Sequence, residues 1–196
     1  MSQRLVVGMT GASGAIFGVR LLQALQGHDV ETHLVVSKWA HQNLEHETDY
    51  GLDDVHALAT RSYSPGDMGA AISSGSFPTM GMVVIPCSAG SLAAIASGMA
   101  GHLVHRAADV VLKERRKLVL VVRETPLHEV HLEAMLTLTR MGATILPPVP
   151  AFYNHPSSID DIVNHVVART LDQFGISVDF AKRWDGKMKR RGQKTG

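Results

Sequence analysis

The segment Leu5–Leu25 constrains the fold most, and it reads LVVGMTGASGAIFGVRLLQAL. It predicts a short apolar strand, a turn rich in glycine and hydroxyl groups at Thr10–Gly14, and then a helix. Such a turn directs backbone N–H groups and two hydroxyls towards an anion, with a helix N-terminus behind them. The segment therefore predicts a site for a phosphate-bearing ligand. The alternative is a tight strand-to-helix turn in which Ser13 caps the helix.

The spacing of the glycines narrows the choice of ligand. They stand at positions 8, 11 and 14, which gives neither G-x-G-x-x-G nor G-x-x-x-x-G-K-[ST]. The turn also contains no lysine. A mononucleotide such as FMN fits this turn better than ATP or NAD does.

Strand-like apolar runs alternate with helical patterns along the whole chain. The helices are expected up to Leu25, from Lys38, up to Lys113, over Leu127–Arg140 and over Ser158–Phe174, and a long loop is expected over Tyr63–Gly81. The strands are expected at Leu5–Gly8, Val30–Val36, Met82–Pro86, Lys117–Val122 and Thr144–Leu146. Apolar strands separated by helices indicate a parallel sheet covered on both faces. We therefore predict a doubly wound α/β fold of the Rossmann or flavodoxin-like kind, with one flavin-binding domain over residues 1–176.

Composition and charge exclude several classes of partner. Residues 1–180 hold 12 Lys and Arg against 17 Asp and Glu, whereas residues 181–196 hold seven against Asp185 alone. The acidic body argues against nucleic acid, and residues 177–196 are expected to form a basic tail. No apolar run reaches the roughly 18 residues of a membrane span. The single cysteine, Cys87, fits a reducing compartment, so we expect a cytoplasmic protein in which Cys87 is a buried apolar residue.

Hydroxyl, cationic and acidic residues follow the predicted strands. They are Ser13, Ser37, Ser88, Ser91, Arg123, Glu124 and Tyr153. Open α/β sheets bind their ligands at the carboxyl ends of parallel strands. We therefore expect these side chains to converge on one site.

Several of the candidate residues also have a purely structural interpretation. Thr125 and Pro126 could begin a helix as N-cap and first residue. Lys113 stands at a helix end, where cations favour the dipole, and Arg169 flanks an apolar stripe along which it could snorkel. Spacing alone makes Glu47 a surface acid.

A metal site is not predicted. The pairs His102/His105 and His128/His131 stand alone, without an H-E-x-x-H motif. The acidic pair Asp160-Asp161 loosely resembles a magnesium–diphosphate motif, but its position in the first turn of a helix explains it better.

Six motifs, spread over nearly the whole chain, resemble those of the UbiX-type flavin prenyltransferases. They are Thr10–Gly14, Val36-Ser37-Lys38, Pro86-Cys87-Ser88, Arg106–Glu114 (RAADVVLKE), Arg123-Glu124-Thr125-Pro126 and Pro148–Tyr153 (PVPAFY). This family includes small subunits encoded beside UbiD-type aromatic-acid decarboxylases. One departure is the loop Ser88–Ser91, where several relatives carry Met-Lys-Thr after the serine.

The resemblance implies a Rossmann-like, homododecameric enzyme that makes prenylated FMN from reduced FMN and dimethylallyl monophosphate. It implies FMN contacts from Gly11, Ala12, Ser13, Ser37, Ser88, Ala89, Gly90, Ser91 and Arg123. It implies a prenyl-phosphate site formed by Lys113, Tyr153 and Arg169. Two family carboxylates match Glu47 and Glu124.

The chemistry of this reaction suits these residue types. An allylic phosphate can ionise without magnesium if two fixed cations and a phenol stabilise the departing dianion. After attachment at flavin N5, ring closure onto C6 requires proton transfers, which suit Glu124 with Ser13, and Glu47. With Lys113, which acts on the departing phosphate, these residues form the predicted catalytic set. Trp184 is a candidate aromatic lid over a passing carbocation.

Two other functions stay open at this point. A flavin-dependent cysteine decarboxylase of the phosphopantothenoylcysteine type shares the fold, but it carries a Pro-Ala-Met-Asn segment where this chain has Pro150–Asn154 (PAFYN). A non-enzymatic flavin carrier that serves a decarboxylase would need the FMN loops, but not Lys113, Glu124 and Arg169 together.

Overall fold

A computed structural model describes residues 3–184 and 186. The strands are β1 (Gln3–Met9), β2 (Val30–Val36), β3 (Arg61–Tyr63), β4 (Gly81–Cys87), β5 (Lys117–Val122) and β6 (Thr144–Ile145). The helices are α1 (Ala15–Leu25), α2 (Lys38–Glu47), α3 (Leu52–Ala57), α4 (Ala89–Ala96), α5 (Leu103–Lys113), α6 (Glu129–Arg140) and α7 (Ile159–Asp172). Two 3-10 turns cover Ala71–Ser73 and Phe152–Asn154.

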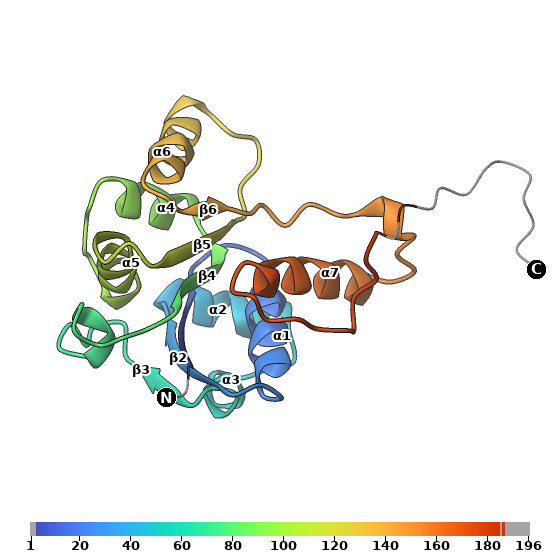
Figure 1. Ribbon diagram of the computed structural model, residues 1–196, viewed down its shortest axis with the longest axis horizontal. Coiled ribbons are helices and arrows are strands. Elements are labelled where there is room, and N and C mark those ends of the chain that lie inside the picture. The colour runs from blue at the N-terminus through green and yellow to red at the C-terminus, as the bar shows by residue number, and fades with distance from the viewer. Residues whose placement is uncertain (1–2, 185, 187–196) are drawn as a thin grey trace, which may run out of the picture.

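The six strands form one sheet in the order β3-β2-β1-β4-β5-β6, and all neighbouring strands pair in parallel. Figure 1 shows α4, α5 and α6 on one side of the sheet and α1, α2 and α7 on the other. This arrangement confirms the predicted doubly wound α/β fold.

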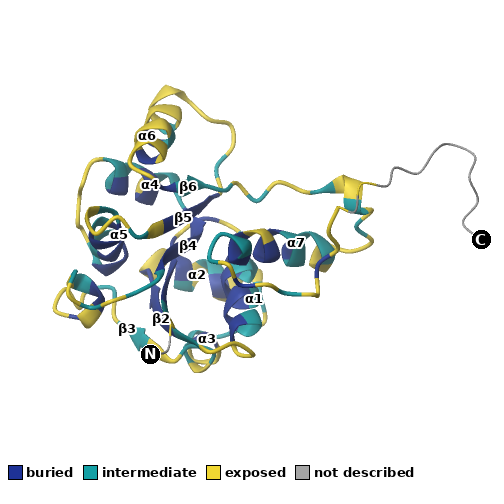
Figure 2. Cartoon of the chain, viewed as in Figure 1, coloured by how far each residue is buried: buried dark blue, intermediate teal, exposed yellow. Residues whose placement is uncertain are grey.

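Each face of the sheet has its own apolar core. Alternate residues of one strand serve both cores: Val7 and Met9 pack under α1 and α7, whereas Val6 packs under α5. Strand β4 is consequently buried throughout, and β1 is apolar and buried from Leu5 to Met9 (Figure 2). Such continuous apolar runs are typical of parallel strands covered on both faces.

Two short elements differ from the prediction. Strand β3 pairs with β2 at the edge of the sheet and begins before the predicted loop Tyr63–Gly81, and α3 follows α2 after a break. Neither element carries an apolar run long enough to stand out in the sequence. Helix α6 begins at Glu129 with His128 as its N-cap residue, so the interpretation of Thr125 and Pro126 as a helix start is wrong.

The chain leaves the sheet after β6. It runs as an extended segment away from the domain to the 3-10 turn Phe152–Asn154, and α7 then brings it back against α1 (Figure 1). Arg20 of α1 fixes the return, because it donates to Asn164 at 2.7 Å and to Asp160 at 3.1 Å. This excursion carries Tyr153 out of the body of the domain.

Candidate functional site

The carboxyl ends of β1 and β4 meet where the strand order reverses. Strands β2 and β3 lie on one side of this pair, and β5 and β6 lie on the other. The Thr10 hydroxyl donates to the Pro86 carbonyl at 3.0 Å and accepts from the Ser88 N–H at 2.8 Å. The two loops are thus joined at the topological switch point, where α/β sheets bind ligands.

The loops after β2 and β5 lie against the same edge. The Ser37 N–H donates to the Met9 carbonyl, and the Arg123 N–H donates to the Cys87 carbonyl, each at 3.0 Å. The structure therefore places Ser37, Ser88 and Arg123 at one edge of the sheet, together with the turn after β1 that carries Ser13.

The turn before α1 holds a carboxylate of the protein itself. Gly14, at φ 103°, is the N-cap residue, and its side-chain-free backbone permits this conformation. Glu47 Oε2 accepts from the Gly14 N–H at 2.7 Å and from the Ala15 N–H at 3.0 Å. Ser13 is exposed and does not cap the helix, so its hydroxyl is free for a ligand.

Ser37 and Ser88 are N-cap residues of α2 and α4. Ser37 Oγ accepts from the Ala40 N–H, and Ser88 Oγ accepts from the Ser91 N–H, each at 3.2 Å. Each cap fixes a hydroxyl at the edge formed by the carboxyl ends of β1, β2, β4 and β5, which we call the ligand edge. Each serine can therefore cap its helix and also face a ligand. Ala12 and Ser91 are buried here, whereas Gly11 and Gly90 are exposed.

Arg123 and Glu124 follow β5 directly. Arg123 is exposed, and its guanidinium forms no hydrogen bond or ion pair with a described residue. The Glu124 side chain accepts only from the N–H of Thr125 at 3.0 Å. Both side chains are therefore available to a ligand at this edge.

Tyr153 and Arg169 line one groove of about 290 Å³, together with Leu146, Pro150 and His165. Arg169 also donates to Asp172 at 2.9 Å. The ring of Tyr153 lies edge-on to those of His165 and Trp184, with centroids 6.0 and 5.7 Å away. The structure thus pairs two of the three predicted phosphate-binding residues and places Trp184 beside them.

Lys113 does not reach this groove within one chain. It lies at the C-terminal end of α5, on the opposite face of the sheet from α7, and four residues before β5 begins. The six residues of β5 span about 20 Å, and they separate Lys113 from Arg123, which follows the other end of the strand. The prediction that Lys113 meets Tyr153 and Arg169 therefore fails for a single copy.

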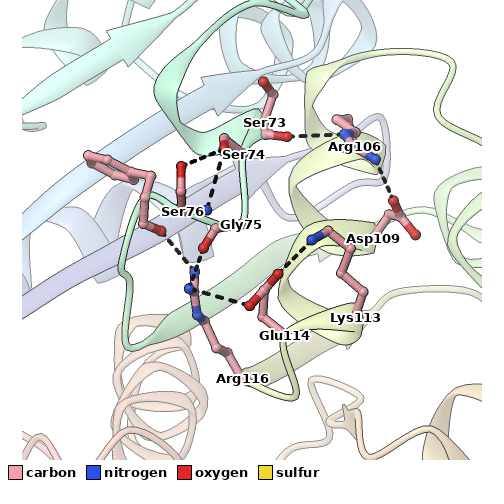
Figure 3. A network of polar contacts seen from close by, with 10 residues as sticks. Ser73, Ser74, Gly75, Ser76, Arg106, Asp109, Lys113, Glu114 and Arg116 are labelled. Atoms are coloured by element: carbon pink, nitrogen blue, oxygen red, sulfur yellow. Dashed lines mark hydrogen bonds and ion pairs between the residues drawn. The ribbon is translucent and has the colours of Figure 1, made fainter.

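Lys113 instead belongs to a polar network around the loop Ser73–Phe77 (Figure 3). Its Nζ lies 2.5 Å from Glu114 Oε1, and this contact holds the pKa of Glu114 below its usual range. Arg106 donates to the Ser73 carbonyl at 3.1 Å, and Arg116 donates to the Gly75 carbonyl at 2.7 Å. The network presents Lys113 at the surface beside a loop of serines.

Sequence reasoning missed two residues of the ligand edge. Trp39 is 66% exposed and lies against Gly11, where an added Cβ would come within 2.4 Å of the Trp39 Cβ. A Trp two residues after the predicted Ser37 was the available signal. His105 contacts Ser91, and only the folded arrangement of α4 and α5 shows it.

Other predictions concern reactive or metal-binding groups. Cys87 is fully buried, and burial raises the pKa of its thiol to about 12, which suits an apolar residue better than a nucleophile. Asp161 accepts from the Ser157 and Ser158 N–H groups and completes a capping box, as its position in the first helical turn suggested. No cluster of three metal-ligating side chains occurs among residues 3–184. No helix in the described part of the chain is long and apolar enough to span a membrane.

The donor set at the ligand edge fits FMN. Serine hydroxyls, backbone N–H groups and one free guanidinium suit a phosphate monoester and a polar ring system. The fold and site together define a flavin-binding α/β protein, and the flavoprotein family model matches residues 1–171.

The curated and solved relatives are more specific. The chain is 64% identical to a probable UbiX-like flavin prenyltransferase of Bacillus subtilis, over 96% of this chain and 93% of the relative. A dodecameric FMN-dependent UbiX-like decarboxylase from Escherichia coli O157:H7 is 62% identical, with a TM-score of 0.93 over 94% of this chain and all of that one. A UbiX protein (PadA1) in complex with FMN and dimethylallyl pyrophosphate is 52% identical, with a TM-score of 0.94 over 96% of this chain and all of that one. The chain belongs to the UbiX-like flavin prenyltransferases.

Proposed function

We propose that the protein transfers a dimethylallyl group from dimethylallyl monophosphate to N5 and C6 of reduced FMN. The product, prenylated FMN, is passed to a UbiD-type decarboxylase in the cytoplasm. The convergence of Ser13, Ser37, Ser88 and Arg123 at one edge, with the Tyr153–Arg169 groove at the end of β6, carries this proposal. A complex of a 52% identical relative with FMN and dimethylallyl pyrophosphate supports it.

The site residues divide into binding and proton-transfer groups. Arg123 and the three serines hold FMN with Gly11, Ala12, Ala89, Gly90 and Ser91. Arg169, Tyr153 and Lys113 stabilise the departing phosphate, which makes transfer independent of divalent metal. Glu124, with Ser13, and Glu47 remove and deliver the protons that ring closure requires. Trp184 covers the groove beside Tyr153.

Lys113 enters the groove from a second copy of the chain. Within one copy it lies on the other face and at the other end of the sheet. It is exposed and therefore accessible to a neighbour, and a 62% identical relative is dodecameric. The proposed homododecamer is thus a condition for a complete phosphate site.

Two alternatives from the sequence have less support. A non-enzymatic flavin carrier would share the FMN edge but does not need the groove of Tyr153 and Arg169. A cysteine decarboxylase would carry Pro-Ala-Met-Asn where this chain has Pro150–Asn154 (PAFYN). The identities of 52–64% to flavin prenyltransferases favour the transferase.

Anaerobic incubation with reduced FMN and dimethylallyl monophosphate tests the proposal. Mass spectrometry of the flavin extracted under anaerobic conditions should show the mass of reduced FMN increased by one C5H8 unit, both with and without EDTA. Unmodified flavin under these conditions would contradict transfer. Activity abolished by EDTA and restored by magnesium would contradict the metal-free phosphate site.

A further inference from the structure

A chain of hydrogen bonds leads from the ligand edge into the protein. The Ser88 hydroxyl donates to Ser91 Oγ at 3.2 Å, and Ser91 Oγ lies 3.1 Å from His105 Nε2. Ser91 is buried, so its hydroxyl depends on partners within the protein. His105, which is partly buried, is the last side chain of this chain of contacts.

The number of protons on the two serine hydroxyls determines which atom donates in each of these hydrogen bonds. Ser88 Oγ already accepts the Ser91 N–H as the cap of α4 and gives its own proton to Ser91 Oγ. Each hydroxyl has one proton, so Ser91 needs an acceptor of its own. The neighbouring His105 Nε2 supplies that acceptor if it carries no proton.

The surroundings of His105 keep its ring neutral. Its ring lies 3.8 Å, centroid to centroid, from the ring of His102, on the same helix. Burial, with a smaller contribution from His102, lowers the pKa of His105 to about 4, so the ring is neutral near pH 7. The remaining proton is then on Nδ1, a buried atom without a partner in the described part of the chain.

We infer that His105 is a positioning residue of the flavin site, whose Nε2 accepts the Ser91 hydroxyl and thereby orients the Ser88–Ser91 pair for FMN. The inference rests on the proposed function, because Ser88 and Ser91 are FMN-binding residues only there. His105 itself does not contact FMN in this assignment. Its effect reaches the ligand through Ser91.

A double-mutant cycle on FMN binding tests this inference. His105→Phe keeps a planar ring without an acceptor, and His105→Gln restores an acceptor through its amide oxygen. His131→Phe is the matched control, since His131 stacks on His128 at 3.6 Å and also has a buried, unpaired Nδ1. Dissociation constants for FMN and melting temperatures are measured for these variants, for Ser91→Ala and for His105→Phe/Ser91→Ala.

We expect His105→Phe to raise the Kd for FMN by roughly 2- to 10-fold, the effect of one hydrogen bond, and His105→Gln to recover much of the loss. His131→Phe should leave the Kd unchanged. In the Ser91→Ala background, His105→Phe should have no further effect, because the partner through which it acts is gone. His105→Leu repeats the cycle with a smaller side chain if the Phe variant folds poorly.

Equal Kd values for His105→Phe and the wild-type protein would overturn the inference, and so would additive effects of the two substitutions. Failure of the wild-type protein to bind FMN would instead overturn the proposed function. The two failures are therefore distinguishable.

Discussion

At the scale of single residues, the chemistry-bearing side chains were readable from the sequence, but their partners were not. Ser13, Ser37, Ser88 and Arg123 each follow a strand, and this position alone predicts one shared edge. The bond between Ser91 and His105 joins residues 14 positions apart through the packing of two helices, which no local pattern encodes. The role of Glu47 as an acceptor for the turn before α1 is likewise a tertiary contact.

Arg123 should contribute strongly to FMN binding because its guanidinium has no competing partner among the described residues. Arg123→Ala is expected to weaken binding by about 1.5–3 kcal/mol, the range for hydrogen bonds to charged groups. Titration of the apoprotein with FMN measures the change. Arg140→Ala, at the distant end of α6, removes the same charge and should leave binding unchanged. Equal losses in both variants would show that net charge, and not this position, matters.

The way in which the free energy of unfolding falls at acidic pH should depend on Asp172. Hydrogen bonds from Arg183, at 2.8 Å to both carboxylate oxygens, and the charge of Arg169 hold its pKa below the usual range. A carboxyl with a depressed pKa in the folded state stabilises the protein at pH values above its unfolded pKa of about 3.9. That contribution is lost as the pH falls through the lower folded value.

Asp172→Asn should therefore reduce stability near pH 7 and make the decline towards pH 3 shallower than in the wild-type protein. Urea unfolding between pH 3 and pH 7 tests this expectation. Asp179→Asn removes a carboxylate nearby that forms no ion pair among residues 3–184, and it should keep the wild-type profile. A parallel shift of the whole Asp172→Asn curve would contradict the assignment.

At the scale of elements, long periodic segments were predicted well and short ones were not. The strands β1, β2, β4 and β5 and the helices α1, α6 and α7 lie within a few residues of their predicted bounds. The three residues of β3 and the six of α3 are stabilised by pairing and packing, and their own patterns are too short to reveal them. The alternative start of α6 at Thr125 and Pro126 is wrong because these two residues form a bend before the helix.

Helix α7 depends on its capping box. Ser158 Oγ accepts from the Asp161 N–H at 3.1 Å, and the Asp161 carboxylate accepts from the Ser158 N–H at 3.2 Å. Ser158→Ala should lower the free energy of unfolding by about 1 kcal/mol, whereas Ser158→Asp keeps a capping oxygen and should cost less. Chemical denaturation measures both. An equal loss in the two variants would mean that the serine acts through packing and not as a cap.

At the scale of the whole molecule, the sequence contained the residues of the proposed phosphate site but not how the fold separates them within one copy. A motif reports which residues are present, and it does not report which face of the sheet each helix covers. Helices α5 and α7 cover opposite faces, as the two separate cores demonstrate. The separation of Lys113 from Arg169 follows from that topology.

Mixed oligomers should reveal a shared site. Lys113→Ala and Arg169→Ala are each expected to lose activity, because each removes one cation from the phosphate. When the two variants are co-expressed, about a quarter of the sites in a randomly mixed symmetric assembly should combine an intact groove with an intact Lys113. Prenylated FMN formation by the purified mixed oligomer measures the recovery. Sites contained within one copy would show none.

The carboxylate of Glu47 has a consequence for the selectivity of the turn before α1. It is tethered beside the Gly14 and Ala15 N–H groups, so any free anion must compete with an intramolecular ligand at high effective concentration. Small anions such as chloride or inorganic phosphate are thus poor competitors for this helix terminus. A ligand that displaces Glu47 must therefore be bound by further contacts along the same edge. Glu47 thereby favours large ligands that make many contacts over small anions.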